Sequence, residues 1–199
     1  MLGLRHSLIA RPDAPDSEHL RCSGEGGPAT AEGLGTRTLI LGLGNPILCD
    51  DAAGLWAARR VHDLLCDPEA DLVEAAVAGL KTVQLLTHYD RAVIIDSIHD
   101  GSAVGEVRRL QEKELGGGCA WQSHSVNLHL ALELARRLSL PLPQELLIYV
   151  IAVKDPHTFG ERFTPEVERA LPGAANRIAA ELAALTARTP GGKPPAPPG

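Results

Sequence analysis

The amino-acid sequence predicts an α/β fold in which helices cover both faces of a mainly parallel sheet. Short apolar runs of strand length alternate with longer segments whose apolar residues recur with a helical period. In chain order the segments read strand, helix, strand, helix, strand, a further short strand, helix, strand and helix. Strands joined by helical crossovers pair in parallel, and the crossover helices then lie on the faces of the sheet.

Five segments are predicted to be strands. Segment 37–43 is an apolar run with glycines at its end, as expected of a strand that is buried on both faces. Segment 91–98 contains Ala-Val-Ile-Ile and is expected to end at Asp96. Segment 105–110 carries polar residues that would be half exposed, which is typical of a short edge strand. The remaining strands are predicted at 71–77 and 146–153.

Four segments are predicted to be helices. Segment 50–65 gathers its apolar residues on one side, and segment 79–88 is shorter but has the same period. Segment 123–138 fits both a strand alternation and a helical stripe, and its length and its alanine and arginine content favour a helix. Segment 164–185 is expected to be a final helix, or a pair of helices, because Pro172 and Gly173 interrupt it.

One domain, residues 37–186, is predicted between two segments rich in glycine and proline. Residues 1–36 and 187–199 have too little apolar surface to offset the entropy of ordering, so both are expected to be disordered. Residues 1–36 also lack the apolar stretch of a secretory signal, which predicts a cytoplasmic protein. The four cysteines lie far apart with no CxxC pair and are expected to be reduced thiols.

Composition excludes two classes of partner. The chain carries 19 Lys and Arg against 25 Asp and Glu, a net charge of −6, whereas a protein that binds a nucleic-acid backbone needs clustered cations. The apolar runs are far shorter than the roughly 20 residues that span a bilayer. We therefore expect neither a nucleic acid nor a membrane as a partner.

The loop between the first strand and the first helix, residues 42–54, is the first candidate for a functional site. In parallel sheets, sites lie beyond the carboxyl ends of the strands. Gly42 and Gly44 begin a dinucleotide-loop pattern, but Ile47 stands where its third glycine would be and Pro46 removes an N–H. Of the adjacent carboxylates Asp50 and Asp51, one is expected to cap the helix, which leaves the other free to face a cation.

Two further strand-end loops add candidate ligands. Asp96 either caps the turn that follows its strand or points into a cleft at the edge of the sheet. His124 follows Ser123, a suitable N-cap, so it would project from the first turn of a helix, whereas His129 points elsewhere. Two carboxylates and one imidazole from three loops form a ligand set suited to a divalent transition metal with open coordination positions.

Four spaced motifs resemble the endopeptidases that mature nickel-iron hydrogenases by removing the C-terminal tail of the large subunit. They are Leu-Gly-Leu-Gly-Asn-Pro with Asp50, Asp51 and Gly54; Ile-Ile-Asp96; Ser123-His124; and the Thr164-Pro-Glu-Val-Glu-Arg-Ala-Leu-Pro172 segment. The resemblance implies a three-layer α/β/α fold with a five-stranded sheet, in agreement with the elements above. It also implies that Asp51, Asp96 and His124 are the metal-binding and catalytic residues.

The same resemblance implies an unusual use of the metal. The three residues would bind nickel that is already loaded in the large-subunit precursor, rather than a metal of the protein's own. Three weak ligands gain affinity only when the substrate supplies the metal and its other ligands. We expect this precursor as the partner and favour a monomer.

Some features depart from the family or fit other classes. The glycine-rich loop that many relatives carry after the second strand is Glu-Ala-Ala-Val-Ala-Gly at 74–79, which leaves substrate choice open and gives Lys81 a potential contact. Two alternative functions stay open.

The Gly-Leu-Gly-Asn-Pro turn also occurs in peptidyl-tRNA hydrolase, an enzyme that needs a basic face for its tRNA substrate, and this makes that hydrolase the first alternative. The second alternative is a chaperone that senses the metal without cutting the precursor. Cys49 has no base beside it in the sequence and is expected to be an inert thiol.

Overall fold

The computed structural model describes residues 37–76, 79–115 and 123–188, all within the compact unit 33–199. Its centre is a five-stranded sheet with the order β2-β1-β3-β5-β4. The four strands β1 (Thr38–Leu43), β2 (Ala70–Ala75), β3 (Arg91–Ile98) and β5 (Glu145–Ala152) pair in parallel, and β4 (Val107–Leu110) is an antiparallel edge strand on β5. The predicted mostly parallel sheet and its edge strand are confirmed.

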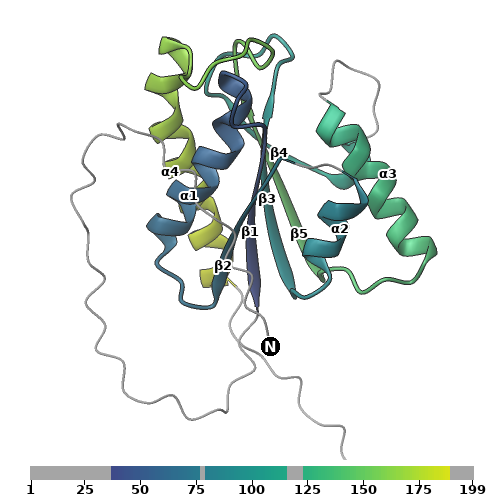
Figure 1. Ribbon diagram of the computed structural model, residues 1–199. Helices are drawn as coiled ribbons and strands as arrows, with labels where there is room; N and C mark the ends of the chain where they lie inside the picture. The colour runs from purple at the N-terminus through teal and green to yellow at the C-terminus, as the bar shows by residue number, and fades with distance from the viewer. Residues whose placement is uncertain (1–36, 77–78, 116–122, 189–199) are drawn as a thin grey trace, which may run out of the picture. The chain divides into compact units, whose positions relative to one another are not determined.

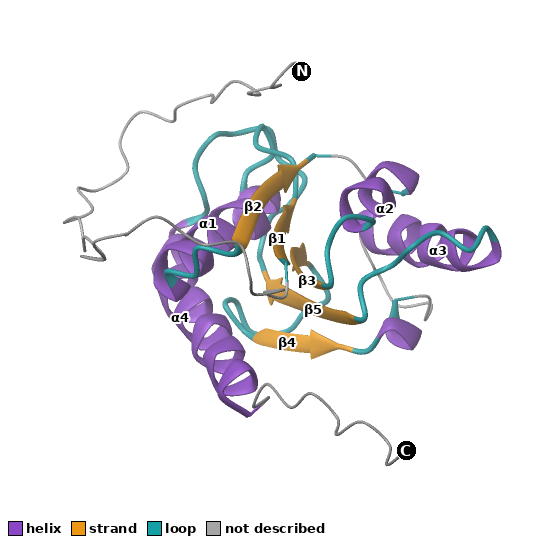
Figure 2. Cartoon of the chain, turned by 90° about the horizontal axis from the view of Figure 1, so that it is seen from below, coloured by secondary structure: helices purple, strands orange, loops and turns teal. Residues whose placement is uncertain are grey.

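Helices cover both faces of this sheet, which confirms the three-layer prediction (Figures 1 and 2). Helices α1 (Ala53–Leu65) and α4 (Pro165–Arg188) lie on one face, and α2 (Leu80–Leu86) and α3 (Ser123–Arg137) lie on the other. Two short 3-10 helices, η1 (Asp50–Ala52) and η2 (Glu112–Glu114), complete the described elements. Segment 123–138, which fitted both a strand alternation and a helical stripe, is thus the helix α3, as its length predicted.

Each face of the sheet carries its own hydrophobic core. Alternate residues of β1 point to opposite sides, so Ile40 packs with α1 and α4 whereas Leu39 and Leu41 pack with α2 and α3. All three side chains are fully buried. Burial on both faces is the reason the strands read as continuous apolar runs in the sequence.

The carboxyl ends of the parallel strands gather at one edge of the sheet, which is the upper end in Figure 1. Strand β1 ends at Leu43 beside Ala75 of β2, and β3 ends at Ile98 beside Ala152 of β5. Two long connections leave this edge, one from β1 to α1 and one from β5 to α4. The first of them, residues 42–54, is one of the three loops in which the sequence placed candidate residues.

The predicted end of the third strand is wrong. Strand β3 does not end at Asp96, since Asp96, Ser97 and Ile98 continue the ladder opposite Val150, Ile151 and Ala152 of β5. Pairing along the full length of β5 extends the strand past its apolar run.

The last segment is one helix rather than a pair, because α4 passes through Pro172 without a break. Pro172 is exposed, while Leu171, Ala174 and Ala175 are buried against the sheet. Burial of this apolar stripe outweighs the helix-breaking tendency of the proline. Helix α4 extends to Arg188, so its last two residues fall in the segment predicted as a tail.

Among the helices that the structure describes, none combines the length and the apolar character needed to cross a membrane.

Candidate active site

Helix α1 starts in direct backbone contact with the sheet, and two glycines make this possible. Gly54 has no room for a side chain, because a Cβ there would overlap the Leu43 carbonyl oxygen and lie 2.7 Å from the Ile95 carbonyl oxygen. Gly44 has φ +147°, and a Cβ there would overlap the carbonyl oxygen of Asp51. The beginning of α1 is therefore held between the ends of β1 and β3.

This packing buries Asp51 at the carboxyl edge of the sheet. The Asp51 side chain is 1% exposed. Its Oδ2 accepts a hydrogen bond from the Asn45 backbone N–H at 2.7 Å, and its Oδ1 accepts one from the Ser97 hydroxyl at 3.2 Å. The second of these bonds ties the β1–α1 loop to strand β3 and fixes the orientation of the carboxylate.

Asp96 lies next to this contact, inside β3 and 3% exposed. Its Oδ1 accepts a hydrogen bond at 2.8 Å from the backbone N–H of Ser97, the residue whose hydroxyl bonds to Asp51. Ser97 thus bridges the two carboxylates. Of the two alternatives for Asp96, the one in which it caps the turn after its strand is wrong, because the residue is part of the strand ladder.

Asp50 is also buried but has a different role from Asp51. Both of its oxygens accept hydrogen bonds from the β5–α4 connection: Thr164 donates its N–H at 2.7 Å and its hydroxyl at 2.9 Å, and Asp155 donates its N–H at 2.8 Å. The N-cap positions of η1 and α1 are Cys49 and Ala52, so the prediction that one aspartate is the helix cap is wrong. Asp50 instead joins two loops that are far apart in the sequence.

The third predicted ligand, His124, is the second residue of α3, and its side chain lies outside the described residues. The structure therefore brings together two of the three predicted site residues. Within the described part of the chain, no group of three or more histidine, cysteine, aspartate or glutamate side chains could hold a metal ion. His129 is half buried in α3, and its Nδ1 has no hydrogen-bond partner among the described residues.

Cys49 has the environment of an inert thiol. Its Sγ donates a hydrogen bond to the carbonyl oxygen of Arg162 at 2.8 Å. Burial and the negative charges of Asp50 and Asp155 raise the pKa of the thiol above its usual value. The protonated form is thus favoured at neutral pH, the opposite of what a nucleophilic cysteine requires.

The loop that departs from the family pattern begins with an ion pair. Glu74 at the end of β2 pairs with Arg59 of α1, and Gly79, with φ +82°, begins α2. Residues 77 and 78 of this loop lie outside the described residues. Lys81 is exposed in the first turn of α2, where a substrate could reach it.

The paired carboxylates can act as oxygen ligands or as general bases. A carboxylate oxygen has two lone pairs, so Asp51 and Asp96 can each ligate a cation while keeping the hydrogen bonds described above. Both carboxylates are buried, and the hydrogen bonds described above fix their orientation.

Sequence reasoning missed the residues that hold the site together, namely Asn45, Ser97 and Thr164. Each donates a hydrogen bond to Asp50 or Asp51. A signal for one of them was present, because Asp50 and Thr164 belong to two of the four motifs that carry the family resemblance. The sequence could not reveal that these motifs are in contact.

Comparison with known proteins agrees with this fold. The family model for hydrogenase maturation protease, HycI, matches residues 58–181. The chain belongs to the hydrogenase maturation protease family, and it is an endopeptidase of that family. This confirms the family that the motifs indicated and sets aside the peptidyl-tRNA hydrolase alternative, which shared only one turn.

Individual relatives are distant. The hydrogenase expression/formation protein HupD of Rhizobium leguminosarum bv. viciae is 24% identical over 167 residues, covering 80% of this chain and 82% of HupD. HupD of Bradyrhizobium diazoefficiens is 24% identical over 135 residues, covering 66% of this chain and 70% of that protein.

Solved structures share the fold. The hydrogenase maturating endopeptidase HybD from E. coli superposes with a TM-score of 0.61 at 23% identity, covering 75% of this chain and 93% of HybD. The [NiFe] hydrogenase maturation protease HybD from Thermococcus kodakarensis gives a TM-score of 0.52 at 28% identity, covering 74% and 99%.

Proposed function

We propose that this protease removes the C-terminal extension of the large-subunit precursor of a nickel-iron hydrogenase, after nickel has been inserted into the precursor. In this proposal Asp51, Asp96 and His124 bind the nickel of the substrate. The metal belongs to the precursor, and the protease supplies ligands that complete its coordination.

The observation that carries the proposal is the bridged pair of buried carboxylates. Asp51 and Asp96 come from different strand-end segments, and both hydrogen-bond to Ser97 at the edge where sites occur in parallel sheets. His124, in the first turn of α3, supplies the imidazole. Carboxylate oxygens and imidazole nitrogens can both coordinate nickel.

The number of protein ligands explains why nickel insertion must precede cleavage. Three protein ligands leave positions open, so the complex is stable only when the precursor brings the metal together with its own ligands. A precursor without nickel would bind weakly and remain uncut. Hydrolysis then needs an activated water, which a polarising metal ion or a carboxylate acting as general base can supply.

The test compares nickel-loaded and nickel-free large-subunit precursor as substrates. Each is incubated with the protein, and the mass of the precursor is measured to detect loss of its C-terminal segment. We expect cleavage of the loaded form only. Cleavage of both forms would contradict nickel recognition, and nickel-dependent binding without any cleavage would favour the chaperone alternative.

Variants test the three residues individually. Asp51→Asn, Asp96→Asn and His124→Ala should each abolish cleavage and also reduce the preference in binding for the loaded precursor, measured by titration calorimetry. The matched controls are Asp63→Asn and His88→Ala. Both residues are exposed; Asp63 lies near the end of α1, and His88 lies between α2 and the start of β3. Unchanged cleavage by any of the three site variants would remove that residue from the proposed site.

A further inference from the structure

The loops that leave β1 and β5 form a short antiparallel ribbon beside the candidate site. Leu48 and Phe159 are bridge partners. The backbone N–H of Cys49 donates to the Thr158 carbonyl at 2.9 Å, and that of Gly160 donates to the Ile47 carbonyl at 3.1 Å. These bonds give a fixed conformation to two loops that would otherwise be independent.

Asp50 anchors this ribbon to the protein. Its carboxylate is fully buried and accepts hydrogen bonds from the backbone of Asp155 and Thr164, on either side of the ribbon's second strand. The first strand of the ribbon runs directly into Asp50 and Asp51. The ribbon therefore cannot shift without disturbing the candidate site.

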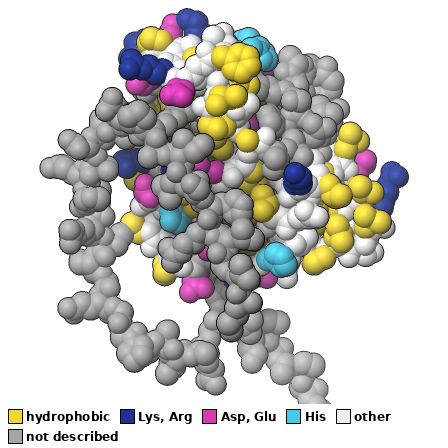
Figure 3. Space-filling view, viewed as in Figure 1, with side chains coloured by type: hydrophobic (Ala, Val, Ile, Leu, Met, Phe, Trp, Pro, Cys, Tyr) yellow, Lys and Arg dark blue, Asp and Glu magenta, His cyan; other side chains and the backbone are white. Residues whose placement is uncertain are grey.

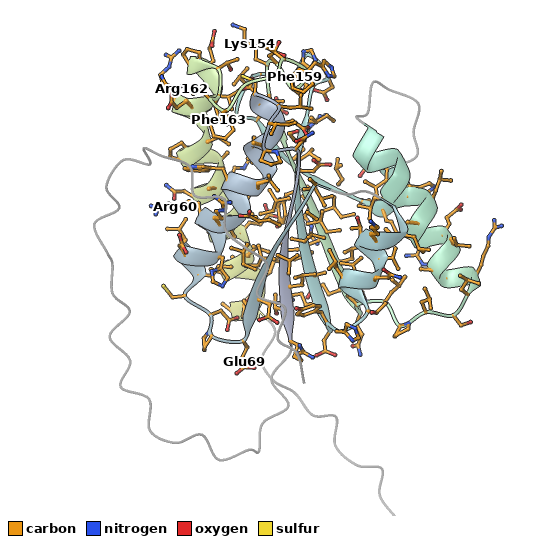
Figure 4. The ribbon with its side chains drawn as sticks, viewed as in Figure 1. Arg60, Glu69, Lys154, Phe159, Arg162 and Phe163 are labelled. Carbon is orange, nitrogen blue, oxygen red and sulfur yellow. The ribbon has the colours of Figure 1, made fainter. Side chains whose placement is uncertain are left out.

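Phe159 projects from this anchored ribbon into solvent. It is 78% exposed, whereas Phe163, four residues later, packs against the core formed by α1, α4 and the sheet. Figure 4 shows Phe159 at the end of the unit with Lys154 and Arg162, opposite to Glu69. An aromatic side chain on a fixed backbone offers a large apolar contact area to another molecule at a small cost in conformational entropy.

We propose that Phe159, with Leu48 beside it, contacts the substrate by packing against an apolar side chain of the precursor near the scissile bond. This inference rests on the proposed function. Only two residues, Cys49 and Asp50, separate Leu48 from Asp51, so a polypeptide whose nickel lies at Asp51 and Asp96 must pass close to the ribbon. Phe159 would determine affinity and specificity without taking part in the chemical step.

The size of the exposed apolar surface favours this occupant over a second copy of the chain. Within the six ribbon residues, Ile47 and Phe159 are the exposed apolar side chains. A buried aromatic side chain contributes about 150–250 Å², whereas a stable protein interface needs about 800 Å² from each partner. The ribbon alone is too small for a dimer interface but large enough to hold one side chain of a peptide.

The experiment measures kcat and KM for nickel-loaded precursor with the wild type, Phe159→Ala, Phe159→Leu and Leu138→Ala. Phe159→Ala should raise KM by about tenfold or more and leave kcat within about twofold, because it removes a contact made equally in the ground and transition states. Phe159→Leu should restore most of the affinity. Leu138→Ala is the matched control, since Leu138 is 58% exposed and follows α3 on the other side of the sheet. Urea unfolding checks that every variant is as stable as the wild type.

Each other result has a definite meaning. An unchanged KM for Phe159→Ala, or a fall in kcat alone, would overturn the inference while leaving the proposed function intact. A wild type that fails to cleave the loaded precursor would overturn the proposed function first. A wild-type dimer in sedimentation that dissociates in Phe159→Ala, with KM unchanged, would assign Phe159 to self-association and so overturn the inference.

Discussion

Asp50 and Asp51 are adjacent and equally buried, yet their carboxylates face different parts of the protein. Asp51 contacts Asn45 and Ser97 at the ends of β1 and β3. Asp50 contacts the β5–α4 connection through Asp155 and Thr164. We conclude that Asp50 has a structural role and that Asp51 is the better candidate for the reaction.

Replacing Asp50 should therefore destabilise the protein. Asp50→Ala removes a buried carboxylate and leaves the half-buried N–H groups of Asp155 and Thr164 without their acceptor, which should lower the free energy of unfolding by about 3 kcal/mol. Urea unfolding followed by circular dichroism measures this change. The exposed Asp63→Ala is the control, with an expected change of about 0.5 kcal/mol or less. An equally small effect at Asp50 would contradict its role as an anchor.

Cys49 should be dispensable for cleavage, although it lies next to the site. Its raised pKa keeps the thiol protonated at neutral pH, so Cys49→Ala should process the precursor at the wild-type rate. The wild-type Cys49 should also react with iodoacetamide more slowly than the exposed Cys66, as measured by peptide mass spectrometry. Complete loss of cleavage in Cys49→Ala would overturn the metal-based proposal.

Helix α1 owes its position to the absence of a side chain at Gly54. The backbone of the helix touches the carbonyl oxygens of Leu43 and Ile95, which places Asp51 within hydrogen-bond distance of Ser97. The contact of the start of α1 with the ends of β1 and β3 thus positions Asp51 in the candidate site. The glycines of the β1–α1 loop serve this packing, and the dinucleotide-loop pattern they begin is incidental.

Two glycine-to-alanine substitutions separate packing from helix propensity. Gly54→Ala should lower the free energy of unfolding by about 3 kcal/mol, because the new methyl group overlaps the Leu43 carbonyl oxygen. Gly173→Ala lies within α4, where a Cβ meets nothing within 4 Å, and should stabilise the protein by up to about 1 kcal/mol. Thermal unfolding should show shifts of opposite sign. A stable Gly54→Ala variant would contradict the close contact of α1 with the sheet.

The elements themselves were predictable because their signals are local. Apolar runs identified the five strands, and helical periods identified the four main helices. A distant contact overrode a local signal in β3, which pairing with β5 continued past Asp96. For the last segment the sequence left one helix or a pair open, and burial of Leu171 and Ala174 favours the single helix through Pro172.

At the scale of the whole molecule, the two core clusters use residues between Leu39 and Leu185. The domain boundaries near 37 and 186 stay a prediction from the sequence. Figure 3 shows, in addition, exposed hydrophobic side chains over α3, where Leu130, Leu134 and Leu138 are among the exposed residues. The cores, not the chain ends, should therefore set the stability.

A shortened chain tests this proposal. Residues 37–188 alone should unfold at the same urea concentration as the full chain, because both described cores remain complete. Equilibrium unfolding of the two proteins at equal concentration makes the comparison. A clearly lower midpoint for the shortened chain would show that residues 1–36 or 189–199 contribute to the stability of the domain.

The sequence by itself determined the order of the elements, the fold class, the family and the identity of the candidate residues Asp51, Asp96 and His124. All of these depend on short patterns of neighbouring residues. Only the tertiary structure showed which aspartate is structural and that Ser97 hydrogen-bonds to two carboxylates. It also showed that Phe159 is exposed whereas Phe163 is packed against the core. The physical reason is distance along the chain: Asp51 and Ser97 are 46 residues apart, and Asp50 and Thr164 are 114 residues apart. Contacts of this kind exist only once the sheet has brought its strand ends together.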